Sequence, residues 1–281
     1  MSTTFTRRIG TAVASLAAVA TLIATPAVVG SPLTGTAHAL PADLAVHAVQ
    51  LTGTENTRTL AYYRAADGRY VDDLVIRSDN LSAITPADGR ALAQRRVRTV
   101  IDLRTQIERA LQPDRPVPGA TTKVFDVLGG ASPTTLVDLS SAYRAFVTDP
   151  GARRAFRDTL LEIKRTTASD NSVLFHCSAG KDRTGWASAV LLTLLGVDRA
   201  GVERDYLASN TFRHTSPADR LNGVNIAWLR TAFATADRVY GSFDNYVRRG
   251  LRLTSRDIAA LKSQLLKSPY RSSFSVLTIG G

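Results

Sequence analysis

The chain has 281 residues, with 35 Lys and Arg against 24 Asp and Glu, and a formal net charge of +11 at pH 7. It contains a single cysteine, which excludes an internal disulfide framework. The positive charge suits phosphorylated molecules, anionic lipid surfaces and nucleic acids alike, but there is no Lys/Arg-rich run of five to eight residues, so we expect no nucleic-acid partner.

Residues 1–39 have the layout of a secretory signal peptide. Arg7 and Arg8 precede an apolar run, and a small-x-small cleavage pattern ends at Ala39. A membrane-spanning helix is the alternative, but Pro26 interrupts the apolar run before it reaches the ~20 residues that spanning requires. We therefore expect an exported, secreted protein whose mature charge is 11 − 2 = +9, because the segment carries two arginines and no acid.

Residues 40–281 are expected to form one α/β domain, in which a central mixed, mostly parallel sheet is flanked by helices. Turn residues, caps and runs of β-branched residues mark its elements. In chain order these are an antiparallel ribbon (59–63 and 74–76), a helix (85–95), two strands (98–104 and 123–128), two helices (139–148 and from 150), a strand and helix (172–195), a helix (198–208), a segment of about two helices (211–240) and two closing helices after Ser242 and Thr254. Segment 211–240 is a candidate helical insertion or lid.

Polar residues follow the predicted strands at their carboxyl ends. In open α/β sheets these ends border the ligand crevice. Asp102 and Arg104 at the end of the predicted strand 98–104, and Glu108 just after it, are therefore candidate site residues, although an internal ion pair explains them equally well. Asp126 lies near the end of the next strand. Arg77 directly follows the predicted strand 74–76, and a surface position is compatible with it.

The cysteine lies in a short loop between the strand and the helix of 172–195. Five residues separate Cys177 from Arg183. A nucleophilic thiolate needs positive surroundings, and here the loop amides, the helix N-terminus and Arg183 supply them. The same groups suit a phosphate dianion, which Arg183 can bind with two parallel hydrogen bonds. The expected phosphate-binding residues are Ser178, Ala179, Gly180, Lys181, Arg183 and Thr184.

This arrangement predicts phosphoryl transfer through a cysteinyl-phosphate at Cys177, without a metal or another cofactor. The leaving oxygen needs a proton donor; Asp182 is the first candidate, Asp126 the second and Asp102 the third. Two further roles concern the thiolate and the loop. Thr184 is expected to donate a hydrogen bond to the sulfur, and His176 to orient the loop, with a buried neutral histidine as the equal alternative.

The segment His176-Cys-Ser-Ala-Gly-Lys-Asp-Arg-Thr-Gly185 resembles the signature of the protein tyrosine phosphatase superfamily, and best that of its bacterial secreted tyrosine and lipid phosphatase family. The resemblance extends to Arg77-Ser-Asp-Asn-Leu81 and to Tyr240-Gly-Ser-Phe-Asp-Asn-Tyr246. It implies a phosphatase fold, Asp182 as general acid, activity on phosphotyrosine, phosphoserine, phosphothreonine and phosphoinositides, and a preference of Lys181 for lipid headgroup phosphates. Contact with an anionic membrane would fit such substrates. The Trp-Pro-Asp loop of the eukaryotic enzymes is missing, which keeps Asp182 first.

Three other functions fit the sequence less well. A nucleotide-binding P-loop needs Ser or Thr after its Gly-Lys pair, and Asp182 stands there. Arsenate reductases regenerate their thiol with a second cysteine, which this chain lacks. An exported module that binds phosphopeptides or anionic lipids without turnover is the remaining alternative, and hydrolysis of an aryl phosphate in the presence of a chelator would separate it from an enzyme.

Overall fold

Five strands form the central sheet in the computed structural model, which describes residues 40–129 and 138–268. Their spatial order is β1 (Arg58–Thr59), β3 (Val75–Ser78), β6 (Ser172–His176), β4 (Val97–Asp102) and β5 (Thr121–Val124). β1 pairs with β3 in the antiparallel sense, and all other pairs are parallel. The prediction of a mixed, mostly parallel sheet is confirmed. The predicted signal segment and the tail after residue 268 lie outside the described residues.

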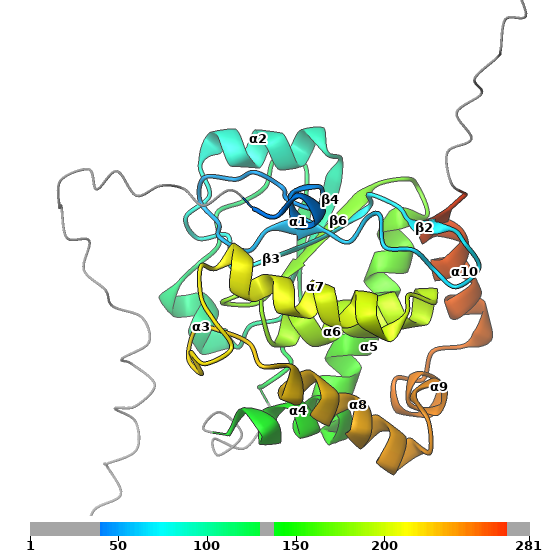
Figure 1. The fold of residues 1–281 in the computed structure, drawn as a ribbon. Helices are drawn as coiled ribbons and strands as arrows, with labels where there is room; N and C mark the ends of the chain where they lie inside the picture. The colour runs from blue at the N-terminus through cyan, green and yellow to red at the C-terminus, as the bar shows by residue number, and fades with distance from the viewer. Residues whose placement is uncertain (1–39, 130–137, 269–281) are drawn as a thin grey trace, which may run out of the picture. The chain divides into compact units, whose positions relative to one another are not determined.

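Alternating side chains of the central strand β6 build two cores, one on each face of the sheet. Val173 and Phe175 are buried in the larger core, and Leu174 between them is buried in the smaller one. Successive residues of a strand point to opposite faces, so a strand that is apolar throughout must be covered on both sides. Figure 1 shows α2 (Pro86–Gln94) on one side of the sheet, with α5 (Pro150–Thr167) and α6 (Arg183–Leu195) on the other.

Capping residues set the starts of several helices, as the sequence predicts. The Thr85 side chain accepts a hydrogen bond from the Asp88 amide, and the Asp88 carboxylate accepts one from the Thr85 amide, which forms a capping box. Asp149 caps α5, with Pro150 at its first position. The other helices are α1 (Ala42–Ala45), α3 (Gln106–Leu111), α4 (Leu139–Thr148), α7 (Arg199–Phe212), α8 (Ile226–Tyr240), α9 (Phe243–Asn245), the π-helical turn η3 (Tyr246–Gly250) and α10 (Ser255–Leu265).

Several predicted boundaries are wrong. The first ribbon strand ends at Thr59, and the strand predicted at 123–128 lies upstream as β5. Within 211–240 the structure has one helix, α8, after the end of α7 and a run of turns. Trp228, Leu229 and Phe233 of α8 are buried, so this helix extends the core. A second small sheet, β2 (Tyr70–Val71) with β7 (Leu266–Lys267), was not predicted because it joins segments almost 200 residues apart.

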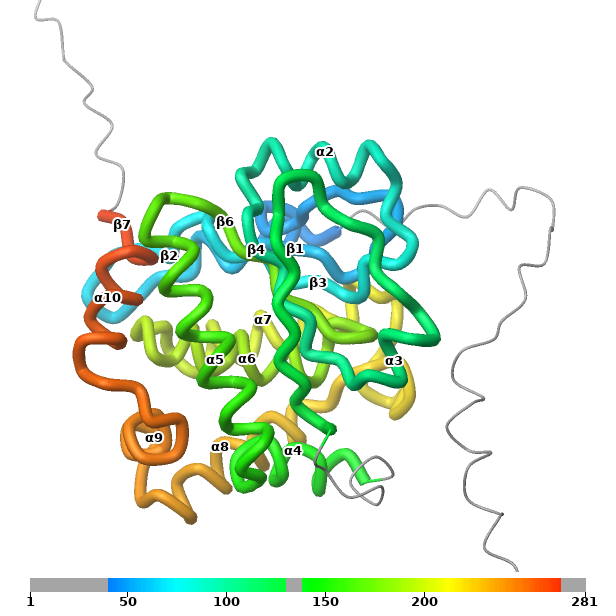
Figure 2. Tube along the Cα trace, turned by 180° about the vertical axis from the view of Figure 1, so that it is seen from behind, coloured from blue at the N-terminus to red at the C-terminus, as the bar shows by residue number. Residues whose placement is uncertain are grey.

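The closing helix α10 lies beside α5 (Figure 2), where Lys164 donates a hydrogen bond to Asp257. Within the described part of the chain, none of the helices combines the length and apolar character that crossing a membrane requires.

Candidate active site

The loop that joins β6 to α6 contains the cysteine and lies at the carboxyl end of the parallel strands. Gly180 within it has φ +64°, and a Cβ there would lie 2.6 Å from Asp79 N and 2.6 Å from Ser78 O. These are backbone atoms, which cannot move aside as a flexible side chain can. Glycine is therefore required at this position by both conformation and space.

Each of four successive carbonyls in this loop is held from outside. Cys177 O lies 3.2 Å from His176 Nδ1, and Ser178 O accepts bonds from Asn80 N (3.1 Å) and Nδ2 (3.0 Å). Ala179 O and Gly180 O both accept from Asn56 Nδ2 at 3.0 Å. In a trans peptide the C=O and the next N–H point in opposite directions. The amides of residues 178–181 therefore face away from these anchors, as a cradle for an anion requires.

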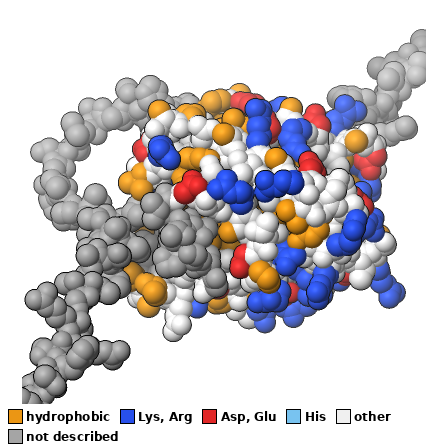
Figure 3. Space-filling model, turned by 90° about the horizontal axis from the view of Figure 1, so that it is seen from below, with side chains coloured by type: hydrophobic (Ala, Val, Ile, Leu, Met, Phe, Trp, Pro, Cys, Tyr) orange, Lys and Arg blue, Asp and Glu red, His pale blue; other side chains and the backbone are white. Residues whose placement is uncertain are grey.

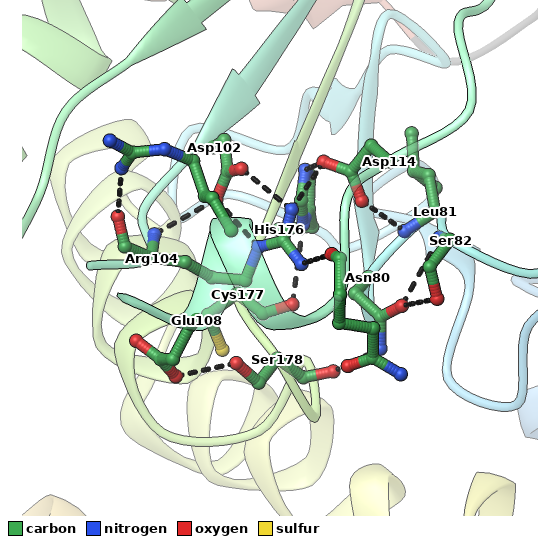
Figure 4. Close-up of polar contacts among 12 residues, drawn as sticks. Asn80, Leu81, Ser82, Asp102, Arg104, Glu108, Asp114, His176, Cys177 and Ser178 are labelled. Carbon is green, nitrogen blue, oxygen red and sulfur yellow. Dashed lines mark hydrogen bonds and ion pairs between the residues drawn. The ribbon is translucent and has the colours of Figure 1, made fainter. Parts of the chain in front are cut away.

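Arg183 is bound by a carboxylate from another element. Its Nη1 and Nη2 lie 2.8 and 2.6 Å from the two oxygens of Glu108 on α3, and Ser178 Oγ donates to the same carboxylate at 2.6 Å; Figure 4 shows the contact between Ser178 and Glu108. Burial alone would lower the pKa of Arg183, but the bonds to Glu108 and the attraction of Cys177 raise it. The guanidinium is thus charged and fixed in orientation.

Asp182 is placed between two donors. Tyr143 OH on α4 donates to its Oδ1 at 3.0 Å, and Lys181 Nζ lies 3.2 Å from its Oδ2. Burial, followed by the charge of Asp182 and the contact with Tyr206, raises the pKa of Tyr143 well above its ordinary value. Tyr143 therefore stays protonated and holds the Asp182 carboxyl at the N-terminus of α6.

Lys181 is buried, and its ammonium is already engaged. Besides the pairing with Asp182, Nζ donates to Gly223 O at 2.9 Å and lies 5.7 Å from the centroid of the Trp228 ring. These contacts connect the loop to the turns before α8. The preference of Lys181 for lipid headgroup phosphates that the resemblance implies stays a prediction, and in this conformation its ammonium is bound within the protein.

The other predicted residues have different surroundings from those expected. The Thr184 hydroxyl is buried and makes no hydrogen bond to any described residue, so the expected bond to the Cys177 sulfur is not formed. Asp126 Oδ1 accepts from the amides of Leu128 and Gly129, next to the undescribed residues 130–137. Asp126 thus stabilises a turn, and it stays the second candidate for the proton donor.

Asp102 is the third candidate donor, and its geometry does not suit that role. Both of its oxygens accept from the Arg104 guanidinium, at 2.9 and 2.8 Å, and the pair is buried (Figure 4). Behind the cysteine, His176 Nε2 lies 3.1 Å from Asp114 Oδ2 without the alignment of a hydrogen bond. Asp102 and Asp114 therefore belong to a buried charge cluster on the strand side of the loop.

Within residues 40–129 and 138–268, one group of side chains could ligate a metal: Asp102, Asp114 and His176, whose donor atoms lie within 4.8 Å of one another. Arg104 Nη2, however, lies 2.8 Å from Asp102 Oδ2 and 2.6 Å from Asp114 Oδ2. A guanidinium cation thus already occupies the space between the two carboxylates. With Arg104 in place, this cluster does not fit a metal ion.

The sheet and this loop define a class of α/β protein that presents a cysteine within an anion-binding loop. The model of the tyrosine phosphatase family matches residues 49–267, and the chain belongs to that family. It is 33% identical over 137 residues to the triple specificity protein phosphatase PtpB of Mycobacterium tuberculosis (39% of this chain, 48% of that protein). It is 34% identical over 157 residues to a tyrosine-protein phosphatase of Nostoc commune (52% of each). The chain spans about half the length of these relatives.

Among solved structures, the crystal structure of TpbA from P. aeruginosa matches with a TM-score of 0.35 and 19% identity, over 63% of this chain and 97% of that one.

Sequence reasoning missed most of the residues that hold the loop. Asn56, Asn80, Asp114, Tyr143 and Asp205 contact the loop or its neighbours, yet none stands near it in the sequence. Arg77, for which the sequence allowed a surface position, is fully buried. The one available signal was the position of Arg77 directly after the predicted ribbon strand 74–76.

Proposed function

We propose that this protein hydrolyses phosphomonoesters through a cysteinyl-phosphate, with phosphotyrosine in proteins as the principal substrate. The observation that carries the proposal is the loop itself. It places four amides and a fixed guanidinium around the only thiol of the chain. Family membership supports the same activity.

The residues present account for both steps. The Cys177 sulfur attacks phosphorus, the P–O bond to the leaving group breaks, and Asp182 gives its proton to the leaving oxygen. A water then attacks the cysteinyl-phosphate, Asp182 takes up its proton, and the S–P bond breaks to release phosphate and the thiolate. Arg183 and the amides balance the charge on the equatorial oxygens throughout.

Asp182→Asn tests the proton donor. General acid catalysis is worth about 10²–10⁴-fold, and a poor leaving group depends on it most. We expect hydrolysis of an alkyl phosphate to fall about 100-fold or more, and that of an aryl phosphate with a good leaving group by less than about tenfold. The matched change Asp126→Asn should have little effect on either. If Asp126→Asn shows the leaving-group dependence instead, the second candidate is the acid.

Phosphoinositides on an anionic membrane are a second candidate substrate, favoured by the surface of α3. Ile107 and Leu111 are 68% and 59% exposed, and their i, i+4 spacing places them on one side of the helix that also carries Glu108. The face in Figure 3 carries more Lys and Arg than Asp and Glu side chains. Exposed aliphatic side chains next to a site, on a positively charged protein, suit an anionic lipid surface.

A substrate panel decides between these candidates. We expect the purified protein, with a chelator present, to hydrolyse phosphotyrosine peptides with a kcat/KM at least about tenfold above that for phosphoinositides in vesicles. The double variant Ile107→Ser, Leu111→Ser should leave peptide hydrolysis unchanged. If vesicle substrates are preferred and the double variant loses only those, the lipid assignment replaces the peptide one. Binding without any turnover would instead identify a phosphate-recognition module.

The signal-like residues 1–39 support a further proposal, that the protein is exported and secreted. Comparison of the N-terminus of the protein recovered from the culture medium with the cell-associated form tests it.

A further inference from the structure

Behind the cysteine loop, three charged side chains from three different elements meet in the core. Arg58 on β1 and Arg77 on β3 both donate to the carboxylate of Asp205 on α7. All three side chains are 0–1% exposed. Charged residues are rarely buried this deeply unless they are paired, and their desolvation is offset only by close pairing and further hydrogen bonds.

The two arginines contact the loop by separate routes. Arg77 Nη2 donates directly to Gly180 O at 2.7 Å. Arg58 Nη1 donates to Asn56 Oδ1, and Asn56 Nδ2 in turn donates to Ala179 O and Gly180 O. Asp205 is therefore linked to these carbonyls by two routes, one through Arg77 and the other through Arg58 and Asn56. The two carbonyls set the direction of the Gly180 and Lys181 amides.

The cluster also carries a net positive charge. Burial and the charge of Arg77 lower the pKa of Arg58, but only to about 10, so it stays protonated at neutral pH. The charges of Arg77 and Arg58 hold the pKa of Asp205 below its ordinary value although burial raises it. Two guanidinium groups and one carboxylate leave one positive charge directly beneath an anion-binding loop, where the low dielectric strengthens its effect.

We propose that Asp205 is a positioning residue for the phosphate cradle: it clamps Arg77 and Arg58 so that the Ala179 and Gly180 carbonyls point outward and their partner amides point at the bound anion. The expected loss of turnover rests on the proposed function. The expected loss of phosphate affinity does not, because binding an anion needs no reaction. Without the carboxylate, the two guanidinium groups repel each other, and Arg77 loses the partner that aims it at Gly180.

The single cysteine permits a test without turnover. Alkylation of the chain by iodoacetate reports on Cys177 alone, and protection by inorganic phosphate gives the dissociation constant of the cradle. For Asp205→Asn we expect this constant to rise at least about tenfold, and kcat/KM for an aryl phosphate to fall about 100-fold, since a displacement of about 1 Å can cost that much. Asp198→Asn is the matched control at the start of the same helix, because Asp198 caps α7 by accepting a hydrogen bond from the Gly201 amide and is not bonded to the loop.

If Asp205→Asn lowers the thermal midpoint but leaves the dissociation constant for phosphate within twofold of wild type, the role of Asp205 is purely structural and the proposal is overturned.

If Asp205→Asn does not fold, Asn56→Ser provides a second test. This change removes the contact with both carbonyls while the bond from Arg77 to Asp205 remains, and we expect the dissociation constant for phosphate to rise about tenfold. An unchanged constant counts against the proposal. If phosphate protects neither protein, a tenfold slower alkylation of the variant supports the clamp and equal rates refute it. Absence of turnover in wild type concerns the proposed function alone.

Discussion

Replacement of Cys177 by serine is expected to lower kcat for aryl phosphate hydrolysis by at least about 10⁴-fold, because a serine hydroxyl beside the same groups is not ionised and makes a far weaker nucleophile. The fold should persist, since the side chain loses little volume and its neighbours in the core remain. Inorganic phosphate should still bind, because the amides and Arg183 are untouched. Steady-state kinetics, with the thermal midpoint as the control for folding, check this.

The chain offers a second route to the same result. Cys177 is the only cysteine, so one equivalent of iodoacetate incorporated per chain should abolish activity, and phosphate should slow both incorporation and inactivation. Substantial turnover by Cys177→Ser, or by the fully alkylated protein, would rule out the cysteinyl-phosphate.

Arg183→Lys is expected to lower kcat/KM about 10³-fold, the upper range for the loss of one group that stabilises developing charge. Lysine keeps the charge but cannot form parallel bonds, so it loses both the fixed pairing with Glu108 and the two-point grip on phosphate. Arg230→Lys is a matched control, because Arg230 makes the same two-bond contact with Glu203 at the surface, at 2.9 and 2.7 Å. That variant should stay within twofold of wild type. Equal losses would mean that the assay reports stability.

The Glu108 pairing also has a defined pH dependence. Burial by itself would raise the pKa of Glu108, but bonds from Arg183 and Ser178 hold it well below its ordinary value. A carboxyl with a lowered pKa in the folded protein contributes stability above its ordinary pKa of about 4.3, and this is lost as the pH falls through the lower folded value. Between about pH 5 and 8 the pair therefore keeps its charges, and any ionisation seen in kcat/KM there belongs to another group.

Local chemistry made the cysteine loop and several helices predictable. A strand, five residues between Cys177 and Arg183, and a following helix are signals within one stretch of chain. The capping pairs Thr85 with Asp88 and Thr254 with Asp257 lie three residues apart, and the structure forms both. The same stretch predicted Asp182 as the first candidate proton donor, but it gave no indication of the hydrogen bond from Tyr143.

The boundaries and partners that were missed depend on distant segments. Asp102 was a reasonable third candidate acid from its position at a strand end, and only the structure shows that Arg104 occupies both of its oxygens. Arg77 at a strand end is equally compatible with a surface position, because its partner Asp205 lies 128 residues away in the sequence. The prediction of about two helices within 211–240 was wrong for a similar reason. The apolar residues of α8 predict a helix, but nothing in the sequence predicts the turns before it.

A lone thiol in an anion-binding loop between a buried strand and a helix is predictable from the amino-acid sequence, because residue type, spacing and backbone freedom act within about ten residues. The contacts that hold this loop appear only in the folded chain: Glu108 binds Arg183, Tyr143 binds Asp182, and Asp205 binds Arg77, which donates to Gly180. The residues of each contacting pair lie 39 to 128 residues apart in the sequence, and the packing of helices α3, α4 and α7 around the sheet brings them together.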